Sequence, residues 1–391
     1  MHILSVNVGS TSFKYRLYRM DAAETELASG HFEGVARTTG SSRQQASAHT
    51  RTKDTPESGY QQAITDMLGF LSETGVMTGF PDAVAFKTVA ALGVTGVVRL
   101  NEDVLSRMER LNALLPAHNP PYVAAIRQFM QLMPNTPLIA SFETGFFSDM
   151  PEHAYLYPLP YALSQQGIRR NGAHGASHEY VTGWVTGRMG RPVKLISCHL
   201  GGSSSLAAVK DGRGVDTTIG LSMQTGLMHN NRIGDIDPYL VFYLHETLGM
   251  SLQDIKHLYG TQSGLLGLSQ GLSGDMRTLT EASSQGDERA AIAVQAYCYQ
   301  LKKQIGAFVA ALGGADALAF TGGIGQNSPQ VRALALEGLA CMGLVLDNEK
   351  NNNAGAGDDI SAAGSPTRLF VVATNEEIII ARKAKALLEG L

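Results

Sequence analysis

The sequence predicts an α/β protein made of two similar domains. Short stretches rich in apolar and β-branched residues alternate with helix-like stretches along all 391 residues, which is the pattern of an α/β fold. A Gly/Ser/Thr-rich turn between two strand-like stretches occurs at residues 4–17 and again at residues 195–209. Asn7 in the first copy aligns with His199 in the second, close to half the chain later. The length also suits about two domains.

Both turns carry groups that bind phosphate oxygens. The first offers the hydroxyls of Ser10 and Ser12, the ammonium of Lys14 and bare backbone N–H groups, and its glycine lets the backbone approach a ligand closely. The second repeats this plan between His199 and residue 205, where two glycines precede three serines. Two such turns at half-chain spacing predict that the two domains face each other across one nucleotide.

The composition is that of an ordinary globular chain. Hydrophobic residues make up 44% and charged residues 17%, and the formal net charge of −4 gives no electrostatic reason to bind nucleic acid or an anionic membrane. Three cysteines without a CxxC spacing or a paired histidine favour buried, reduced thiols over metal or redox chemistry. The first residues lack a signal-peptide core and no apolar run approaches a membrane span, so a cytoplasmic location is expected.

In the first half, local patterns predict strands that frame helices. The expected elements are edge strands and an exposed loop in residues 28–59, helices at residues 60–74 and 102–115, and buried strands at residues 83–86 and 137–144. Prolines at positions 116, 120 and 121 predict irregular structure and a helix that starts at Tyr122. The second strand ends in polar residues, where ligands of open α/β sheets collect.

A proline-rich run at residues 150–160 marks the expected boundary between domains of residues 1–149 and 150–377. The expected elements beyond it are a helix through Trp184, a mostly helical segment at 240–279, a long helix at 288–312, a strand, glycine turn and helix from residue 316, an exposed loop at 351–359, a strand at 369–373 and a helix from residue 378. Ser328 is expected to cap a helix whose first residue is Pro329.

Seven motifs that keep their order along nearly the whole chain resemble the acetate kinase family of acyl-phosphate-forming kinases. They lie at residues 7–14, 118–121, 174–175, 199–201, 232–238, 321–325 and 374–377. The resemblance implies two ribonuclease-H-like domains of the actin and hexokinase type, related by duplication, with the nucleotide in the cleft between them. It also implies ATP or ADP and Mg²⁺ as reactants, a homodimer formed through the second domain, and a final helix (378–391) that returns to the first domain.

The resemblance implies a role for each matched residue. His174 and Arg232, with Lys87 and Glu143, are expected at the transferred phosphoryl group. The residues expected to bind phosphates and nucleotide are Asn7, Ser10, Ser12, Lys14, His199, Gly201, Gly202, Asp275, Arg277, Gly322, Gly323, Ile324, Gly325 and Asn327. Glu376 and Asn7 are expected to hold Mg²⁺. For Lys87 and His199 a purely structural role is an equal alternative.

The chain departs from the family pattern around the acceptor. Lysine 87 stands where the family has an arginine followed by Val-Val-His-Gly-Gly, Glu143 where it has aspartate, and Gly202 where it has asparagine. The residues expected to line the acceptor pocket are Val89, Ala117, Ala173 and Met223. The last three replace leucine, phenylalanine and proline, and each change from leucine or phenylalanine to alanine empties roughly tens of Å³. The acceptor pocket is therefore expected to be wider than acetate needs.

These observations predict an ATP-dependent kinase that reversibly phosphorylates the carboxylate of a small organic acid larger or more polar than acetate. A carboxylate needs no general base, whereas a hydroxyl acceptor would need one, and Glu143 is placed to serve. A hydroxyl kinase and a nucleotide-binding protein with little transfer activity therefore stay as alternatives. A nicotinamide dehydrogenase is set aside, because residues 322–325 lack the G-x-G-x-x-G spacing.

Overall fold

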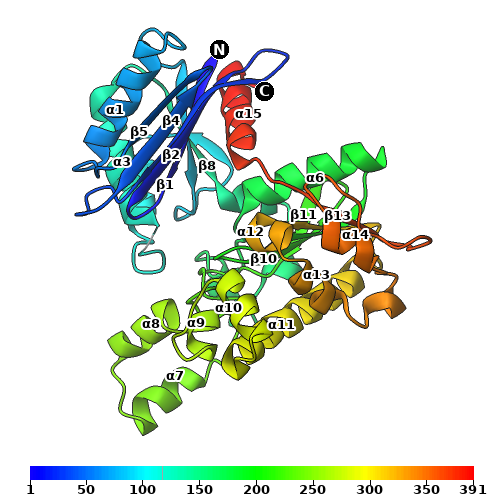
Figure 1. Ribbon diagram of the computed structural model, residues 1–391. Helices are drawn as coiled ribbons and strands as arrows, with labels where there is room; N and C mark the ends of the chain where they lie inside the picture. Colours follow the sequence, from blue (N-terminus) through cyan, green and yellow to red (C-terminus); the bar gives the residue numbers. More distant parts are fainter. Residues whose placement is uncertain (117) are drawn as a thin grey trace. The chain divides into compact units, whose positions relative to one another are not determined.

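The structure is a computed structural model that describes residues 1–116 and 118–391. The chain divides into two compact units (Figure 1): unit 1 comprises Met1–Gly145 with Asn375–Leu391, and unit 2 comprises Phe146–Thr374. The boundaries expected from the sequence, after residue 149 and after residue 377, each lie a few residues later than these. Each unit contains one β-sheet with helices on both faces, as an α/β fold requires.

Unit 1 is built on an eight-stranded sheet with the order β5-β4-β3-β2-β1-β6-β8-β7. Its strands are β1 (His2–Val8), β2 (Ser12–Arg19), β3 (Thr25–Glu33), β4 (Ser41–Ala46), β5 (His49–Lys53), β6 (Ala83–Thr88), β7 (Val97–Arg99) and β8 (Leu138–Phe142). Strands β1, β6 and β8 run parallel, so their carboxyl ends lie at the same edge of the sheet. The polar residues 28–59 form the antiparallel strands at the other side, as expected.

The α-helices of unit 1 are α1 (Tyr60–Glu73), α2 (Glu102–Glu109), α3 (Asn119–Leu132) and α15 (Glu376–Glu389), and the short helix η1 (Glu143–Phe147) begins in unit 1 and ends in unit 2. Helices α1 and α3 cover one face of the sheet and α15 the other (Figure 1). Strand β1 shows why: Leu4 and Val6 are buried in the core beneath α1 and α3, whereas the hydroxyl of Ser5 donates to the carbonyl oxygen of Glu377 in α15 at 2.8 Å.

Three helix boundaries in unit 1 differ from the sequence-based expectation, and one of them is the start of α15 at Glu376 rather than at residue 378. Helix α3 begins at Asn119 rather than Tyr122, because its two prolines occupy the first turn, where no backbone donor is needed. Helix α2 ends at Glu109, well before residue 115, and the chain continues in turns.

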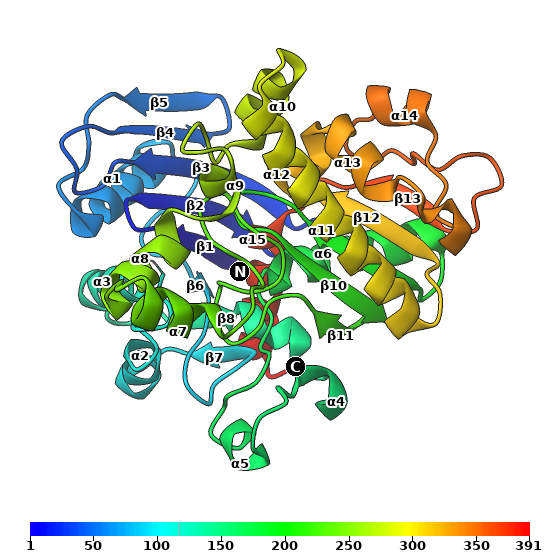
Figure 2. The ribbon, with the colours of Figure 1, turned by 90° about the horizontal axis from the view of Figure 1, so that it is seen from below.

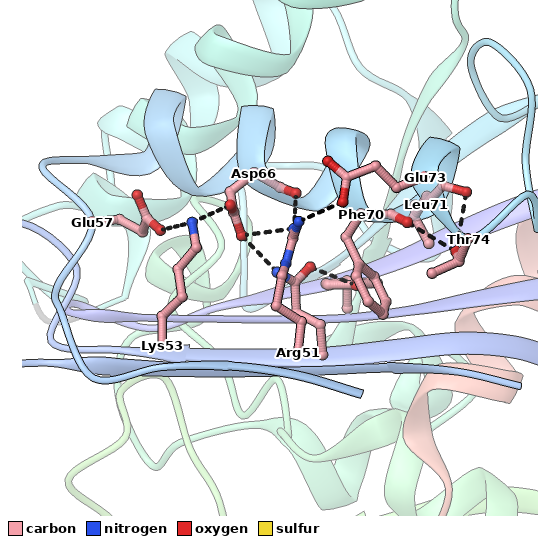
Figure 3. Close-up of polar contacts among 10 residues, drawn as sticks. Arg51, Lys53, Glu57, Asp66, Phe70, Leu71, Glu73 and Thr74 are labelled. Atoms are coloured by element: carbon pink, nitrogen blue, oxygen red, sulfur yellow. Dashed lines mark hydrogen bonds and ion pairs between the residues drawn. The ribbon is translucent and has the colours of Figure 1, made fainter. Parts of the chain in front are cut away.

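A group of charged side chains, the Asp66 cluster, fixes the edge strand β5 to α1 (Figure 3). The Asp66 carboxylate accepts hydrogen bonds from Gln44 Nε2 at 2.6 Å and from Arg51 at 3.1 Å, and it also accepts from Lys53. The Lys53 ammonium lies 3.5 Å from Glu57. Asp66 is only 10% exposed, so these pairs are much less screened by solvent than surface ion pairs.

Unit 2 contains a five-stranded sheet with the order β11-β10-β9-β12-β13. Its strands are β9 (Lys194–His199), β10 (Ser205–Lys210), β11 (Arg213–Thr217), β12 (Ala317–Thr321) and β13 (Arg368–Val371). Two antiparallel pairings are followed by two parallel ones, which is also the pattern of β3-β2-β1-β6-β8 in unit 1. The repeated topology agrees with the expected duplication.

Helices α6 (Gly175–Met189) and α11 (Glu288–Leu312) cover opposite faces of this sheet (Figure 2). The alternation of β9 assigns the faces: Leu195 packs with Val181 of α6, and Ile196 packs in the cluster that contains Tyr297 of α11. The remaining helical elements are α4 (Glu152–Tyr155), α5 (Tyr161–Ser164), α7 (Leu240–Phe242), the π-helical turn η2 (Tyr243–Thr247), α8 (Leu252–Thr261), α9 (Gly264–Leu268), α10 (Met276–Ser284), α12 (Gly322–Asn327), α13 (Pro329–Leu336), η3 (Leu339–Met342) and α14 (Asn348–Asn353).

Two sequence-based expectations for unit 2 were wrong. The expected glycine turn after β12 is the short helix α12, although Ser328 caps α13 as predicted, its hydroxyl accepting from the N–H of Val331 at 3.3 Å. Asn351, placed in an exposed loop, is buried in α14, because Arg332 donates to its side-chain oxygen at 2.7 Å and to its carbonyl oxygen at 2.8 Å. Among the described residues, none of the helices combines the length and apolar character of a membrane span.

Candidate functional site

The predicted site residues of unit 1 gather at the carboxyl ends of its parallel strands. Asn7 lies at the end of β1, Lys87 at the end of β6 and Glu143 directly after β8, while Glu376 is the first residue of α15. The Lys87 ammonium donates to Glu376 Oε2 and lies 3.9 Å from Glu143 Oε2. Side chains from three distant parts of the chain therefore meet at this edge of the sheet.

The first glycine-serine turn joins β1 to β2 next to these residues. The N–H of Gly9 donates to the carbonyl oxygen of Ser12 at 2.8 Å, and the hydroxyl of Tyr60 donates to the carbonyl oxygen of Gly9. Ser10 and Lys14 are exposed, and Lys14 lies opposite Asn7 in the β1–β2 register. These two hydrogen bonds fix the backbone of the turn, while the Ser10 hydroxyl and the Lys14 ammonium stay accessible to a ligand.

Two residues that sequence reasoning missed hold this region in place. The hydroxyl of Tyr122 donates to Asn7 Oδ1 at 2.9 Å, and burial raises the pKa of Tyr122, so the phenol stays a donor. The side-chain amide of Asn119 donates to the carbonyl oxygens of Ala90 at 3.1 Å and Met108 at 2.7 Å, which fixes the segment after β6. The polar residues around the Pro-Pro pair were the only available signal.

In unit 2, His174 belongs to a buried hydrogen-bonded chain. Its Nδ1 lies 2.8 Å from Ser205 Oγ, which lies 2.9 Å from Nε2 of His178, and Nδ1 of His178 lies 2.8 Å from Ser197 Oγ. We call these four residues the histidine chain. Burial, and then the nearby His199, hold the pKa of His178 well below its usual value, so this imidazole is neutral. A neutral ring has one donor and one acceptor nitrogen, and the tautomers of the two chain histidines are therefore linked.

His199 is the last residue of β9, and its ring stacks on that of His174 with centroids 4.3 Å apart. Its Nδ1 lies 2.7 Å from the hydroxyl of Ser177 in α6. His174 itself adopts left-handed backbone angles (φ 55°) at the residue before α6, an unusual conformation for a side chain with a Cβ. Stacking and hydrogen bonds from two elements therefore fix both imidazoles where the sequence predicted phosphate contacts.

Arg232 keeps its charge without a carboxylate partner among the described residues. Its NH1 donates to the carbonyl oxygen of Met223 at 2.9 Å, and Asp235 instead accepts from the N–H of Gly226 at 2.8 Å. Burial lowers the pKa of Arg232 to about 10, which still leaves the guanidinium protonated at neutral pH. A partly buried cation with no carboxylate partner among the described residues is suited to an anionic ligand.

Unit 2 also contains a pocket of about 620 Å³, within the range of small-molecule sites. The predicted residues that line it are Gly201, Gly202, Asp275, Arg277, Gly323, Ile324 and Asn327. The lining residues that were not predicted are Asn230, Gly274, Met276, Thr280 and Ser328. Most of the nucleotide-binding residues expected in the second half of the sequence thus meet around one cavity.

Helix α12 forms one wall of this pocket, and contacts with Leu200 and Arg332 fix its position. Gly322 has a φ of 76°, and a Cβ there would lie 2.5 Å from the carbonyl oxygen of Leu200, so this position requires glycine. The N–H of Ile324 donates to the same carbonyl oxygen at 2.9 Å. At the other end, the buried Arg332 donates to the carbonyl oxygen of Gly325 at 2.9 Å. Gly322 and Gly325 therefore shape the wall without lining the pocket.

The pocket lining also includes the start of α10, which Asp275 caps. Its carboxylate accepts from the backbone N–H of Arg277 at 2.8 Å and pairs with the Arg277 guanidinium at 2.7 Å, which together lower the pKa of Asp275. Gly202 has room for a side chain, since a Cβ there would meet its nearest neighbour, the amide nitrogen of Asn230, at 3.5 Å. The glycine at 202 is therefore not demanded by packing.

The predicted acceptor-pocket residues are distributed over both units. Val89 of unit 1 is partly buried against the core, and Ala173 and Met223 of unit 2 are 2% and 7% exposed. Ala117 lies outside the described residues.

The predicted metal ligands have the right chemistry for Mg²⁺, which prefers oxygen donors and takes few of them from protein. The Glu376 carboxylate and the Asn7 amide oxygen are such donors, although Lys87 and Tyr122 bond to them here. Among the described residues, no group of three or more His, Cys, Asp or Glu side chains is arranged to hold a metal ion. The chemistry of these two oxygen donors fits Mg²⁺.

The repeated sheet, the two glycine-serine turns and the nucleotide-sized pocket define a phosphotransferase with the actin and hexokinase type of fold. Comparison with known proteins then gives the family. Residues 2–382 match the model of the Acetokinase family, so the chain belongs to that family. It is 36% identical over 389 residues to the acetate kinase of Shouchella clausii (97% of this chain, 98% of the relative) and 38% identical over 394 residues to that of Clostridium botulinum (98% and 99%).

The structure is similar to solved members of the family. A propionate kinase from Francisella tularensis superimposes with a TM-score of 0.90 at 32% identity, covering 98% of both chains. The acetate kinase of Porphyromonas gingivalis gives a TM-score of 0.87 at 32% identity, covering 99% of both. The expected resemblance and fold are confirmed, and the chain is a phosphotransferase that uses ATP and a carboxyl group as acceptor.

Proposed function

We propose that this enzyme reversibly transfers the γ-phosphoryl group of ATP to the carboxylate of a small organic acid larger or more polar than acetate. The observation that carries the nucleotide part is the pocket of about 620 Å³ in unit 2, lined by the residues predicted to bind adenosine and phosphates. In this proposal unit 2 is the nucleotide domain and unit 1 contributes the acceptor side, and the enzyme works in the cytoplasm.

The reaction asks the protein to position charges rather than to form covalent bonds. A carboxylate oxygen of the acid attacks the γ-phosphorus, the bond from that phosphorus to the β–γ bridging oxygen breaks, and the products are an acyl phosphate and ADP. The acid is already ionised at neutral pH and needs no general base. Catalysis then consists of alignment and stabilisation of charge on the equatorial oxygens of the transferring group.

Within this proposal, Arg232 and His174 stabilise the charge of the transferring group. Arg232 suits that task because it is cationic, partly buried and without an ion-pair partner among the described residues. His174 suits it because the histidine chain fixes its ring on one side and stacking fixes it on the other. Lys87 supplies a further cation at the unit 1 side, and Glu143 lies beside it.

The phosphate-binding roles follow the two turns. We assign Asn7, Ser10, Ser12 and Lys14 to the phosphoryl end of the nucleotide. The corresponding residues of unit 2 are His199, Gly201 and Gly202, with the pocket residues around α12 holding the adenosine. Glu376 and Asn7 would hold Mg²⁺, which supplies charge neutralisation of the nucleotide phosphates.

The size of the acceptor is the finer part of the proposal. Ala173 stands where the resemblance places phenylalanine, and Met223 where it places proline. One of the structurally similar family members is a propionate kinase, an enzyme for a three-carbon acid. Both observations support an acceptor with more than the two carbons of acetate.

The test is a panel of acids assayed with ATP and Mg²⁺, with hydroxylamine trapping of acyl phosphate. Acetate, propionate, butyrate, lactate and glycerate separate chain length from polarity. We expect kcat/KM to rise from acetate to one of the larger acids. Acetate as the best acceptor would refute the widened pocket. ADP formation without a hydroxylamine-reactive product would favour the hydroxyl kinase, and no ADP from any acid would favour the non-catalytic alternative.

We also propose that the enzyme is a homodimer formed through an apolar arm of unit 2, residues 236–272. Its exposed large apolar side chains are Ile236, Tyr239, Leu240, Phe242, Tyr243, Leu248, Leu252, Leu268 and Leu272. Across α7, η2 and α8, all of them described, Ile255 is the single buried residue. So many exposed apolar side chains in one continuous segment are typical of a protein interface. In a two-fold symmetric dimer, each copy of the chain would bury this segment against the other.

The dimer is tested by light scattering during size-exclusion chromatography. The wild type is expected to elute as a dimer at micromolar concentration, and the double variant Leu248→Glu/Leu252→Glu as a monomer. Phe80→Glu is the control, because Phe80 is equally exposed (55%) but lies in unit 1. A monomeric wild type, or a dimer that survives both charges in the arm, would refute this part.

A further inference from the structure

Lys87, Glu143 and Glu376 form a group of one ammonium and two carboxylates, which we call the ion triad. The Lys87 ammonium donates to Glu376 Oε2 and lies 3.9 Å from Glu143 Oε2. The three side chains are 16%, 3% and 13% exposed, so water screens them poorly. Two carboxylates that face each other in such a place need a cation between them.

Lys87 is that cation in this structure. Lys87 lies near the end of β6. The register pairs it with Ser141 of the neighbouring strand β8, two residues before Glu143.

The proposed metal position uses the same carboxylate. Mg²⁺ binds oxygens at roughly 2.0–2.1 Å in a strict octahedral arrangement, whereas an ammonium sits about 2.7–2.9 Å from a carboxylate oxygen. A divalent ion that takes Glu376 would thus meet the Lys87 ammonium at close range, and like charges repel. The two cations compete for one carboxylate.

We propose that Lys87 is a tethered counter-cation that holds the two glutamates together without metal and must release Glu376 before a divalent ion binds there. The proposal rests on the proposed metal role of Glu376. Its functional meaning is an exchange: Lys87 becomes available to the transferring phosphoryl group only when the metal–nucleotide complex has replaced it. Metal affinity in the absence of nucleotide is correspondingly weak.

The test measures metal binding without turnover. Wild type, Lys87→Met and Lys87→Arg are titrated with Mn²⁺ in the absence of nucleotide, and free Mn²⁺ is followed by electron paramagnetic resonance. Lys87→Met is expected to bind at least tenfold more tightly than wild type, and Lys87→Arg, which keeps the cation, about as weakly as wild type. Equal or weaker binding by Lys87→Met would overturn the proposal.

A matched control comes from the Asp66 cluster, in which Lys53 also lies between two carboxylates, Glu57 and Asp66 (Figure 3). Lys53→Met is expected to leave Mn²⁺ affinity unchanged. An increase equal to that of Lys87→Met would mean that removing any paired lysine creates a metal site, and would overturn the specific assignment.

Two further measurements separate the inference from the proposed function. Adding Glu376→Gln to Lys87→Met is expected to abolish the gain in affinity; a gain that persists would show that the metal does not use Glu376, and the metal assignment itself would fail. In the wild type, the ¹⁵N signal of the salt-bridged Lys87 ammonium is expected to shift or vanish on addition of Mg²⁺ and ADP. A signal that stays unchanged while the metal–nucleotide complex binds would overturn the exchange without any variant.

Discussion

Removal of the Ser205 hydroxyl is the most direct probe of the histidine chain. The hydroxyl is buried and lies within hydrogen-bond distance of His174 Nδ1 (2.8 Å) and His178 Nε2 (2.9 Å). Ser205→Ala removes one oxygen and leaves two buried ring nitrogens without that partner. A lost partner of a buried polar group costs about 1–3 kcal/mol. If that loss falls on the transition state, kcat falls roughly 5- to 150-fold.

The assay is steady-state kinetics with hydroxylamine trapping, together with urea unfolding to confirm the fold. We expect kcat to fall while KM for ATP stays within twofold, because the adenosine pocket is lined by other residues. The pH profile is expected to change as well, since the tautomer of His174 is no longer linked to His178. The control is Thr182→Val, which removes a buried hydroxyl of α6 that donates to the backbone carbonyl oxygen of His178 and not to either imidazole ring among the described residues. A folded Ser205→Ala enzyme with wild-type kcat and pH profile would refute the role of the chain.

Three other predictions concern the scaffold. Asp66→Ala removes the shared partner of Arg51 and Lys53, which keep Glu73 and Glu57 as neighbouring carboxylates, and is expected to lower the free energy of unfolding by roughly 1–2 kcal/mol in urea at pH 7; a loss below about 0.5 kcal/mol would contradict it. Arg332→Met frees α12 and is expected to raise KM for ATP about tenfold with little change in KM for the acid; equal changes in both would point to general misfolding. Burial, with a smaller contribution from Arg232, lowers the pKa of His229 to about 3, so the unfolded state binds an extra proton below pH of about 6.5 and stability falls by about 1.4 kcal/mol per pH unit. For His229→Gln we expect the free energy of unfolding to depend less steeply on pH between pH 6 and 4.5, by about 1.4 kcal/mol per pH unit. A slope equal to that of the wild type would contradict this prediction.

Local patterns in the sequence were sufficient for most of the scaffold. The helix expected at residues 288–312 is α11 with the same bounds, and Ser328 and Pro329 start α13 as predicted. Such features depend on periodicity and capping, which neighbouring residues determine by themselves. The error at α12 has the same origin: glycines usually mark turns, whereas the N–H groups of Ile324 and Gly325 donate to the carbonyl oxygen of Leu200, a residue far away in the sequence.

The site depended on contacts that no local pattern contains. The pairing of Lys87 with Glu376 spans most of the chain, and the hydrogen bond from Tyr122 to Asn7 joins a helix start to a strand end. Asn351 looked like part of a polar loop because the sequence does not show that Arg332 is buried beside it. Family resemblance placed many residues in the right neighbourhood, but their partners became visible only with the fold.

The return of α15 to unit 1 has a consequence for how the protein is made. Residues 375–391 leave the ribosome after all of unit 2, so the sheet of unit 1 waits for one of its covering helices during the whole synthesis of unit 2. In that interval the β1 hydroxyl of Ser5 lacks the carbonyl of Glu377, and Lys87 lacks Glu376. A nascent or prematurely terminated chain therefore presents a half-covered sheet and lacks Glu376, the proposed metal ligand, and that exposed surface distinguishes it from the complete protein.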